Sequence, residues 1–445
     1  MGEPSLGPPD MAALLSTSSW RRAHWALFSV ISLNYFADGI IFSIAPLIVS
    51  VLAPASFPAI FAANLLSEML GAILLGYLAD RYGRRPIFTA ALLLEMAALL
   101  LLIFTYESTL ALLLLTSLLN FGVGGEFGAA YAALAELLPA KDRGKALLLA
   151  PNFWNVGAAF IAGLALAFGE LYQSASPQLG ALLASAVLVA AGIRLARLAL
   201  PESPRWLLLR GRAEQALAIA RRFTGHGGAL SGSPLREEGV GMAEALRRYT
   251  FRFAVLAIIT VVQYLTYNMM AYYAPYAPGF SFGLESVPYV IFTANLGAAV
   301  GALPLALLID RARRVATFVA FAGGLLGSLL LLYAHALASL PYYLLSLFVA
   351  LIFSEWAWGT LSALQSELFP TGVRSSLVGL LTGLTGLSGA LVVQVEASIT
   401  AQQYLILASL LWALGLGAAG AWLYRGVESA RRALEELLIR EVAGP

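Results

Sequence analysis

Five carboxyl side chains lie inside long hydrophobic stretches, where no Lys, Arg or His stands at mid-depth to pair with them: Asp38, Glu68, Glu95, Glu126 and Glu355. An ionised carboxylate is costly in an apolar environment, so such groups favour the neutral form and can exchange protons near neutral pH. We predict that Asp38, Glu126 and Glu355 couple proton movement to the work of the protein. For Glu68 and Glu95 we favour the simpler role of a neutral acid in a packing hydrogen bond.

Every asparagine of the chain also falls within these stretches: Asn34, Asn64, Asn120, Asn152, Asn155, Asn268 and Asn295. A side-chain amide in lipid costs free energy unless it faces a partner or a wet cavity. Asn64 and Asn295 precede glycine-containing helix faces and are predicted to make interhelical hydrogen bonds. The amides and aromatic residues predicted to bind a solute in a cavity are Asn34, Asn152, Asn155, Gln263, Tyr267, Asn268 and Trp358.

The missing mid-depth cations also restrict the solute. A permanently anionic solute would meet several acids without a counter-charge. Amides and hydroxyls suit a neutral hydroxylated solute, because they hydrogen-bond to hydroxyl groups while aromatic rings cover apolar faces. A cation would fit the acids equally well on electrostatics alone.

These residues must be positioned by apolar stretches of about 20 residues, which is the length of a helix that crosses a bilayer. The predicted spans are 24–53, 57–79, 86–105, 108–138, 146–170, 178–199, 251–276, 284–309, 315–337, 339–368, 376–399 and 402–424. Hydrophobic residues make up 60% of the chain and charged residues 12%, about half the charge of a soluble protein. The predicted fold class is an all-α polytopic membrane protein with twelve transmembrane helices.

Lys and Arg occupy every second gap between the spans, which predicts that those gaps and both termini are cytoplasmic. The predicted organisation is a tail (1–23), a six-helix bundle (24–200), a central loop with short amphipathic helices (201–250), a second bundle (251–425) and a C-terminal helix (426–445). We expect a monomer in the plasma membrane. The net charge of +2 is spread over the loops and gives no indication of nucleic-acid binding, and the absence of cysteine excludes disulfides and Cys-ligated metals.

The two halves repeat one another. Phe61-Ala-Ala-Asn64-Leu returns as Phe292-Thr-Ala-Asn295-Leu, an offset of 295 − 64 = 231 residues. The spacing of Glu136, Pro139 and Arg143 returns in a second segment at the same offset, 367 − 136 = 231. Parallel repeats of this kind are a known transporter architecture, with the solute site between the halves.

Three segments resemble motifs of the major facilitator superfamily: Gly76-Tyr-Leu-Ala-Asp80-Arg81-Tyr-Gly83-Arg84-Arg85, Pro201-Glu202-Ser-Pro-Arg205-Trp206 and Glu367-Leu-Phe-Pro370-Thr-Gly-Val-Arg374. The resemblance implies a secondary transporter that works by alternating access, with no catalytic residue, metal or cofactor beyond a proton gradient. It also implies a cytoplasmic gate that latches the two halves. We expect its pairs to be Asp80 with Arg84, Glu136 with Arg143, Glu202 with Arg205, Asp310 with Arg311, and Glu367 with Arg374.

The branch of the superfamily is mixed. Gln263, Asn268 and the string Tyr272-Tyr-Ala-Pro275 resemble sugar porters, whereas Gly124-Gly-Glu126-Phe resembles metabolite–proton symporters. We therefore expect proton-coupled symport of a sugar or similar small neutral organic solute. The alternatives are a proton-coupled carrier or exporter of an organic acid or organic cation and, more remotely, a membrane sensor with a transporter fold. Small solute, protons and membrane lipid are the expected partners.

Overall fold

The computed structural model describes residues 11–194, 201–226 and 241–439. Within these ranges twelve helices are long and apolar enough to cross a membrane. The first six are α2 (Arg22–Leu52), α3 (Phe57–Tyr82), α4 (Arg84–Thr105), α5 (Thr109–Leu137), α6 (Arg143–Leu171) and α7 (Ala175–Arg194). The second six are α11 (Thr250–Asn268), α12 (Val287–Ala306), α13 (Arg313–Ala336), α14 (Leu340–Glu367), α15 (Arg374–Glu396) and α16 (Ala401–Arg425). The predicted twelve-span, all-α fold is confirmed.

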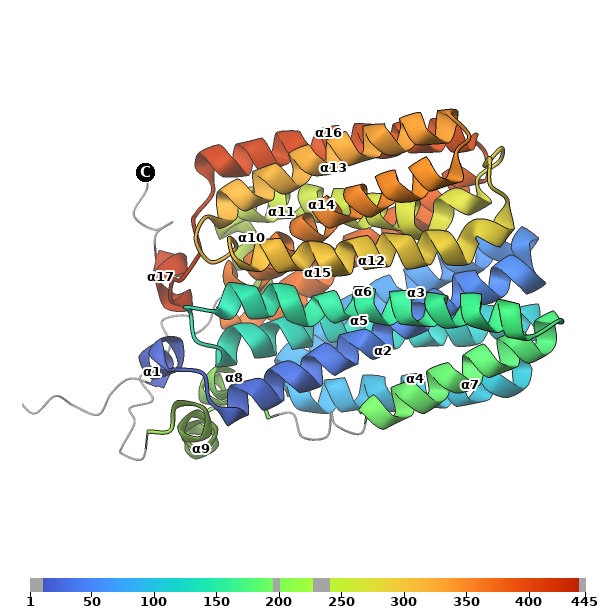
Figure 1. The fold of residues 1–445 in the computed structure, drawn as a ribbon. Helices are drawn as coiled ribbons and strands as arrows, with labels where there is room; N and C mark the ends of the chain where they lie inside the picture. The colour runs from blue at the N-terminus through green and yellow to red at the C-terminus, as the bar shows by residue number, and fades with distance from the viewer. Residues whose placement is uncertain (1–10, 195–200, 227–240, 440–445) are drawn as a thin grey trace, which may run out of the picture.

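The long helices run side by side, and short helices gather at one end of the bundle (Figure 1). The short helices at that end are α1 (Met11–Thr17), α8 (Pro204–Leu209), α9 (Ala213–Thr224) and α17 (Leu434–Ile439), while α10 (Met242–Arg248) leads into α11. We call this the charged end; it is built from residues 80–85, 136–145, 202–214, 310–314, 367–376 and 425–432. The opposite end, built from residues 42–61, 272–285 and 394–404, is called the aromatic end.

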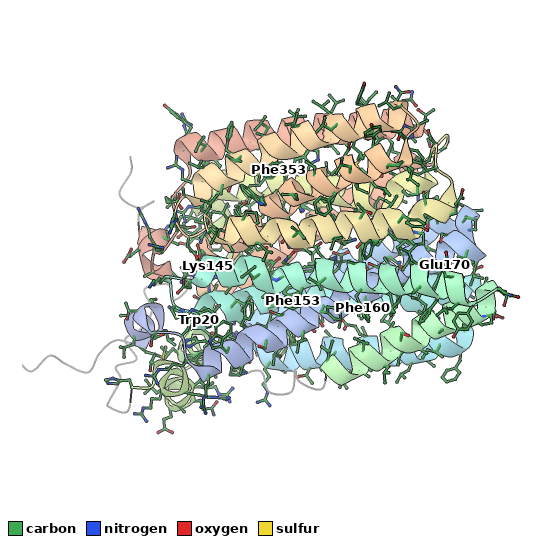
Figure 2. All side chains as sticks on the ribbon, in the orientation of Figure 1. Trp20, Lys145, Phe153, Phe160, Glu170 and Phe353 are labelled. Atoms are coloured by element: carbon green, nitrogen blue, oxygen red, sulfur yellow. The ribbon has the colours of Figure 1, made fainter. Side chains whose placement is uncertain are left out.

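The flanks of the bundle carry large exposed hydrophobic side chains. Leu93, Leu188 and Leu303 are each more than half exposed, at 64%, 77% and 62%. Figure 2 shows such side chains along the bundle, with Lys145 near the charged end and Glu170 at the opposite end. An apolar surface of this extent is unusual in a soluble monomer, so the flanks are the surface that contacts lipid.

The two halves approach each other closely where small residues face backbone. A Cβ atom on Gly379 of α15 would meet the carbonyl oxygen of Ala72 on α3, and one on Gly76 would lie 2.9 Å from the carbonyl oxygen of Ser375. Small residues at helix crossings allow backbones to come together in this way. α3 and α15 therefore form a tight contact between the halves, beside the central site.

The seventh span is broken near the aromatic end. α11 ends at Asn268 and continues as a π-helical turn, η3 (Met269–Tyr273), and a 3-10 turn, η4 (Ala274–Tyr276). Pro275 cannot donate a backbone hydrogen bond, and its ring disfavours a regular helix just before it. The break turns Tyr272, Tyr273 and Tyr276 towards the first half, as the contacts below show.

The C-terminal helix is shorter than predicted. In the described residues after α16, only Leu434–Ile439 is helical. The segment before it is irregular and contacts the charged end. Glu428 accepts a hydrogen bond from the backbone N–H of Arg314 at the start of α13, at 3.2 Å, and the carbonyl of Arg432 accepts from Arg143, at 2.7 Å.

Candidate functional site

A small cavity of about 40 Å³ lies between the two halves. Its lining residues come from α2, α5 and α6 of the first half and from α11 and α14 of the second: Tyr35, Phe42, Phe127, Pro151, Trp154, Asn155, Gln263, Tyr264, Tyr267, Asn268, Glu355 and Trp358. A volume of this size holds a few waters at most. The structure is therefore a contracted state, in which the central site is closed around too little space for a sugar-sized solute.

The structure brings together five of the seven residues predicted to bind solute. The five that line the cavity are Asn155, Gln263, Tyr267, Asn268 and Trp358. Glu355, one of the three acids predicted to couple protons, lines it as well. Tyr35, Phe42 and Phe127 were not predicted from the sequence; aromatic residues are common throughout the spans, and spacing alone does not separate cavity rings from packing rings.

Asn34 and Asn152 do not line the cavity, contrary to the prediction. The Asn152 amide donates to the carbonyl of Ala299 on α12 at 3.1 Å, so it serves the contact between the halves. Asn34 points instead into a group of acids. The sequence indicated that both amides are buried in the membrane spans. It could not show whether each one faces the cavity or a neighbouring helix.

Glu355 is held by an amide from the opposite half. Asn155 donates to one Glu355 oxygen at 2.7 Å, while the second oxygen, Oε1, has no hydrogen-bond partner among the described residues. The Tyr267 hydroxyl lies 2.6 Å from the Asn295 oxygen and 3.2 Å from the Asn155 oxygen, and either oxygen can accept its single proton. A buried acid at the cavity wall is therefore linked by hydrogen bonds to both halves, with one oxygen free for a proton or a solute hydroxyl.

The predicted roles of Asn64 and Asn295 are confirmed in part. Asn64 accepts from Thr116 at 2.8 Å and from Ser117 at 3.1 Å, both on α5, which is the interhelical bonding expected. Asn295 also bonds between helices, but its partner Tyr267 belongs to the cavity wall. Its role is therefore closer to the site than the sequence indicated.

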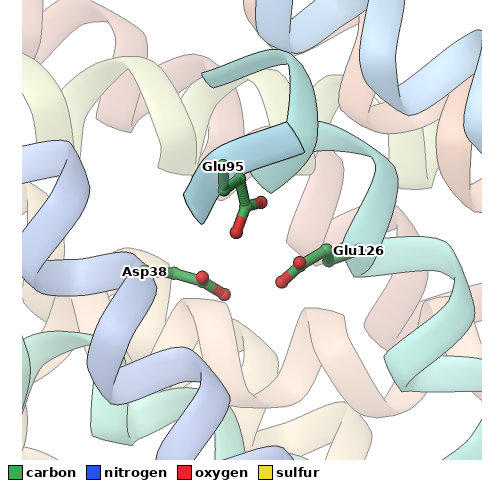
Figure 3. Close-up of side chains that lie close together, drawn as sticks. All are labelled: Asp38, Glu95 and Glu126. Carbon is green, nitrogen blue, oxygen red and sulfur yellow. The ribbon is translucent and has the colours of Figure 1, made fainter. Parts of the chain in front are cut away.

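Two of the predicted proton-coupling acids lie together. One carboxylate oxygen from each of Asp38, Glu95 and Glu126 lies within 4.8 Å of the other two, and all three residues are buried. Figure 3 shows the three groups pointing towards a common space from α2, α4 and α5. The Asn34 amide donates to Asp38 at 2.9 Å and to Glu126 at 2.6 Å.

Glu95 joins this acid cluster although the sequence assigned it to packing, because the rotation of α4 decides which face meets α5. Carboxylates at this separation repel one another when they are ionised, and burial strengthens the repulsion. Glu355 is not a member of the cluster.

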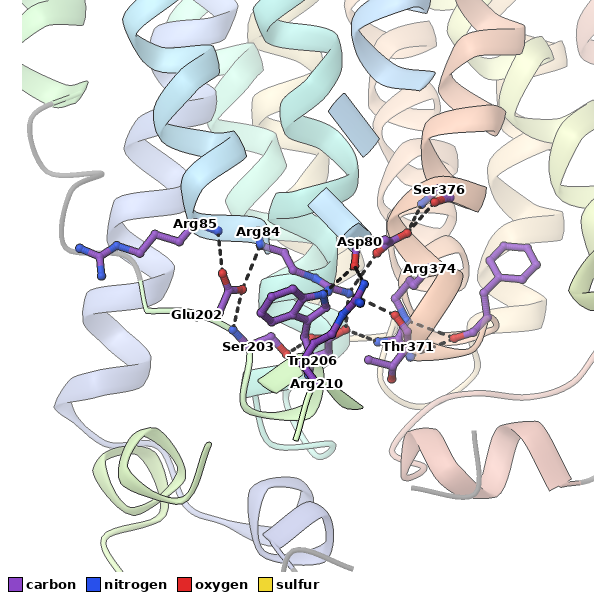
Figure 4. Close-up of polar contacts among 12 residues, drawn as sticks. Asp80, Arg84, Arg85, Glu202, Ser203, Trp206, Arg210, Thr371, Arg374 and Ser376 are labelled. Carbon is purple, nitrogen blue, oxygen red and sulfur yellow. Dashed lines mark hydrogen bonds and ion pairs between the residues drawn. The ribbon is translucent and has the colours of Figure 1, made fainter. Parts of the chain in front are cut away.

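The charged end is closed by buried ion pairs between the halves (Figure 4). Glu136 accepts from Arg374 at 2.8 Å and from Arg84 at 3.4 Å, and Ser203 also donates to it. Asp80 accepts from the backbone and hydroxyl of Ser376, both at 2.7 Å. Each of these acids thus holds an element of the second half.

Two predicted gate pairs exchange partners. Glu136 and Arg143 were expected to pair, as were Glu367 and Arg374, but Glu136 binds Arg374 while Glu367 binds Arg143 at 2.9 Å. The two motifs occupy equivalent places in the two halves and face each other. Crossed pairing satisfies both acids and latches the halves, which pairing within each motif would not do.

The Asp310 pair is also corrected. Asp310 pairs with Arg313 at 3.4 Å and accepts from the backbone of Lys145 at 3.1 Å, whereas Arg311 is exposed. Burial raises the pKa of the Asp310 carboxyl above its usual value, and the charge of Arg313 opposes this shift. Arg313 also donates to Glu367. The gate arginine here is therefore Arg313, and not Arg311 as the sequence predicted.

Glu202 and Arg205 bind separate parts of the gate. Glu202 accepts from the backbone N–H groups of Arg84 at 3.0 Å and Arg85 at 3.2 Å, at the start of α4. Carboxylates are favoured at helix N-termini, where backbone N–H groups lack partners. Arg205 donates to the backbone carbonyl of Glu136, so both residues fix first-half elements around the central acid.

The aromatic end is closed by rings and hydrogen bonds to carbonyl oxygens. Tyr276 stacks on Phe57 with centroids 3.6 Å apart, and its hydroxyl donates to the Pro46 carbonyl at 2.6 Å. Tyr273 meets the edge of Phe57 at 5.8 Å, and Tyr272 meets Phe42 at 5.3 Å. Contacts between the halves therefore lie at both ends of the bundle, with the central cavity between them.

Comparisons with known proteins agree with this architecture. The profile of the Major Facilitator Superfamily matches residues 27–393. The inner membrane metabolite transport protein YgcS of Escherichia coli (strain K12) is 32% identical over 344 residues, which cover 73% of this chain and 72% of that protein. The niacin transporter NiaP of Acinetobacter baylyi is 25% identical over 386 residues, covering 82% and 85%.

Among solved structures, the proton:xylose symporter XylE bound to 6-bromo-6-deoxy-D-glucose superimposes with a TM-score of 0.76 at 19% identity, over 93% of this chain and 98% of that chain. That likeness shows the fold. The family profile covers most of the chain, and the YgcS match covers nearly three quarters of it. The chain is therefore a multi-pass membrane protein that belongs to the major facilitator superfamily.

Proposed function

We propose that this transporter is a secondary active carrier, which moves a small neutral organic solute such as a sugar together with protons by alternating access. The observation that carries the proposal is the cavity between the halves. Amide, hydroxyl and aromatic groups line it, and no Lys, Arg or His is among its described lining residues.

The lining suits a solute with hydroxyl groups. The side-chain oxygens of Gln263 and Asn268 are buried without a hydrogen-bond partner among the described residues. Unpartnered buried acceptors are costly, so a solute hydroxyl that donates to them would be favoured. The rings of Trp154 and Trp358 would cover an apolar face of the same solute.

The acids supply the proton-binding groups of the proposal. Asp38 and Glu126, with Glu95, share protons in the first half, and Glu355 carries one at the cavity wall. Since Asn155 links Glu355 to the opposite half, a change in the charge of Glu355 would alter the contact between the halves. That is the coupling a symporter needs.

Alternating access follows from the two closed ends. Opening the charged end would require the crossed ion pairs to separate, and opening the aromatic end would require the rings to part. We place the charged end and both termini in the cytoplasm, on the positive-inside rule, in the plasma membrane and in a monomer. A proton gradient would drive the cycle without a cofactor, and no role in nucleic-acid binding is proposed.

An organic acid, such as the niacin named for NiaP, is the second candidate. It is favoured by the aromatic walls, which suit a flat ring. It is disfavoured by Glu355, whose charge would repel an anion unless the acid were protonated. An organic cation, export in place of uptake, and a sensor that binds without carrying remain as outcomes of the test.

The test is solute binding followed by uptake. Purified protein would be screened for thermal stabilisation by neutral sugars and polyols, by niacin and by organic cations, and the solutes that stabilise it would be tested in proteoliposomes with a proton gradient. We expect a neutral hydroxylated solute to accumulate, and a protonophore to abolish accumulation while exchange continues. Stabilisation by anions alone would favour the second candidate, and binding without uptake would indicate a sensor.

Matched variants make the result specific to the site. Asn155→Ala should weaken solute binding, because it removes a cavity amide and the partner of Glu355. Asn64→Ala should leave binding unchanged, since Asn64 bonds only to α5 among the described contacts. Asp38→Asn should abolish accumulation and leave counterflow. Accumulation as in the wild type would transfer the coupling role to Glu126 or Glu355.

A further inference from the structure

Glu68 joins the two halves at a place separate from the acid cluster. The hydroxyl of Tyr264 on α11 donates to Glu68 Oε2 on α3 at 2.6 Å. Tyr264 also lines the cavity. Glu68 is fully buried, and its second oxygen, Oε1, has no hydrogen-bond partner among the described residues.

One hydrogen bond is too little to stabilise an ionised carboxylate in a buried interface. A buried charge is stabilised only when it is paired and its lone pairs are satisfied. The closed contact between α3 and α11 therefore suits the neutral carboxyl, which loses less hydration on burial. Separation of the halves would admit water and suit the ionised form.

The groups that face Glu68 leave it without a counter-charge among the described residues. Tyr264 contacts it, and Tyr273 lies within electrostatic range of it. On the other helices packed against α3, Glu95 and Glu126 belong to the acid cluster and Glu396 stands on α15. Asp80 and the ion pairs of the charged end lie about three helical turns further along α3.

Glu396 provides a connection to the aromatic end. It is the last residue of α15 and is only 2% exposed, and neither of its carboxylate oxygens has a hydrogen-bond partner among the described residues. The hydroxyls of Tyr273 and Tyr404 are also buried without partners there. Tyr273 lies within electrostatic range of both Glu68 and Glu396, and Tyr404 within that of Glu396.

Electrostatic interactions and one hydrogen bond connect these buried polar groups from Glu396 to the cavity wall. Glu396 interacts with Tyr273 and Tyr404, Tyr273 interacts with Glu68, and Glu68 is bonded to Tyr264 at the cavity wall. Carboxyl groups inside membrane spans are rare and commonly mark ion or proton pathways. If these groups served packing alone, each buried polar atom without a hydrogen-bond partner would cost free energy.

We propose that Glu68 is a second proton-binding site, which takes up a proton when the halves close at the aromatic end, and that Glu396 passes protons to it from that end. The proton moves between carboxyl oxygens and water, and no other bond changes. Closure is then favoured at low pH and opening at high pH. The proposal concerns the conformation of the protein without solute, so it does not rest on the proposed symport.

The experiment measures the distance across the aromatic end against pH. The chain has no cysteine, so Val51→Cys and Tyr289→Cys, both 46% exposed and in opposite halves, would carry the only spin labels. In lipid nanodiscs without solute, we expect longer distances to gain population as pH rises. Glu68→Gln should remain closed across the range, because the amide keeps the size and cannot ionise.

Controls separate this site from the other acids. Glu170→Gln, an exposed acid on α6, should respond to pH as the wild type does. Asp38→Asn should retain the pH response if Glu68 carries it. A full wild-type response in Glu68→Gln would overturn the proposal, and loss of the response in Asp38→Asn alone would assign it to the acid cluster and likewise overturn it.

Two further variants test the link and the route. If Glu68→Gln does not fold, Tyr264→Phe removes the hydroxyl while keeping the ring, and it should shift the distances towards the open state at neutral pH. Glu396→Gln should leave the equilibrium distances unchanged but slow the response to a pH jump several-fold. An unchanged rate would remove Glu396 from the route, and unchanged distances in Tyr264→Phe would overturn the role of the link.

Discussion

The charged end and the aromatic end close the same two halves by different chemistry. At the charged end, the crossed pairs Glu136–Arg374 and Glu367–Arg143 are fully buried. At the aromatic end, Tyr276 stacks on Phe57 and donates to a carbonyl oxygen, and no Lys or Arg lies among the described residues there.

The difference predicts how each end opens. Removing one partner of a buried ion pair costs about 3–5 kcal/mol, because the other charge is left without a counter-charge, whereas an aromatic pair adds about 0.5–1.5 kcal/mol beyond the area it buries. The charged end should therefore behave as an all-or-none latch. The aromatic end should respond in smaller steps.

The largest effect is expected for Arg374→Ala, which removes one partner of a crossed ion pair at the charged end. The change leaves Glu136 with its longer contact to Arg84 and removes a donor to the Phe369 carbonyl. We expect the closed state at that end to lose about 3–5 kcal/mol of stability relative to the open state. The open population should then rise more than about 100-fold. Spin labels at Tyr82→Cys and Tyr424→Cys, which are exposed and in opposite halves, would measure it.

Arg311→Ala is the control for that variant, since it removes the same charge from an exposed position at the same end. It should leave the distances unchanged. Equal effects of the two variants would mean that net charge, and not the crossed pairs, closes the charged end.

A variant in the central cavity should leave the opening of both ends unchanged. Asn268 lines the cavity, donates to the Tyr264 carbonyl at 2.9 Å and has an unpartnered oxygen. Asn268→Ala should weaken solute binding by about 1–3 kcal/mol, roughly 5- to 150-fold, because a buried hydroxyl loses its partner. Titration calorimetry would measure the loss, with Asn64→Ala as control. Intact binding in Asn268→Ala and failure in the control would reverse the cavity assignment.

Tyr276→Phe should loosen the aromatic end by a smaller amount. It keeps the ring stack on Phe57 and removes only the hydrogen bond to the Pro46 carbonyl, a net loss of about 1 kcal/mol. The labels at residues 51 and 289 should show a several-fold rise in the open population. A shift as large as that of Arg374→Ala at its own end would contradict the proposed difference between the ends.

The smallest effect is expected for Asp310→Asn. Burial raises the pKa of Asp310 in the folded protein, so its protonated form contributes stability at low pH, and that contribution is lost as pH rises through the raised value. The variant should therefore show a flatter dependence of melting temperature on pH, above about pH 4. Asp142→Asn, which alters a partly exposed pair with Lys145, should keep the wild-type slope. If Asp310→Asn showed the wild-type slope of melting temperature against pH, this would contradict a raised pKa for Asp310.

Much of the site could be read from residue type. The sequence placed Asn155, Gln263 and Asn268 at the cavity because a buried amide needs a partner, and the structure puts them there. It did not reveal Glu396 as a buried acid, because that residue stands at the end of a predicted span, where an acid normally reaches water. Only the packing of α15 beneath the aromatic end removes it from solvent.

The sequence by itself determined the number of spans, the repeat of the halves and the family. These follow from local properties, since each helix must be apolar over the width of a bilayer and each motif is contiguous. The tertiary structure decided the partners: Arg374 for Glu136, Glu95 beside Asp38, and Tyr264 for Glu68. Partner choice depends on the rotation of each helix and on how the halves meet, and because the repeat gives each motif two equivalent partners, only their arrangement in space selects one.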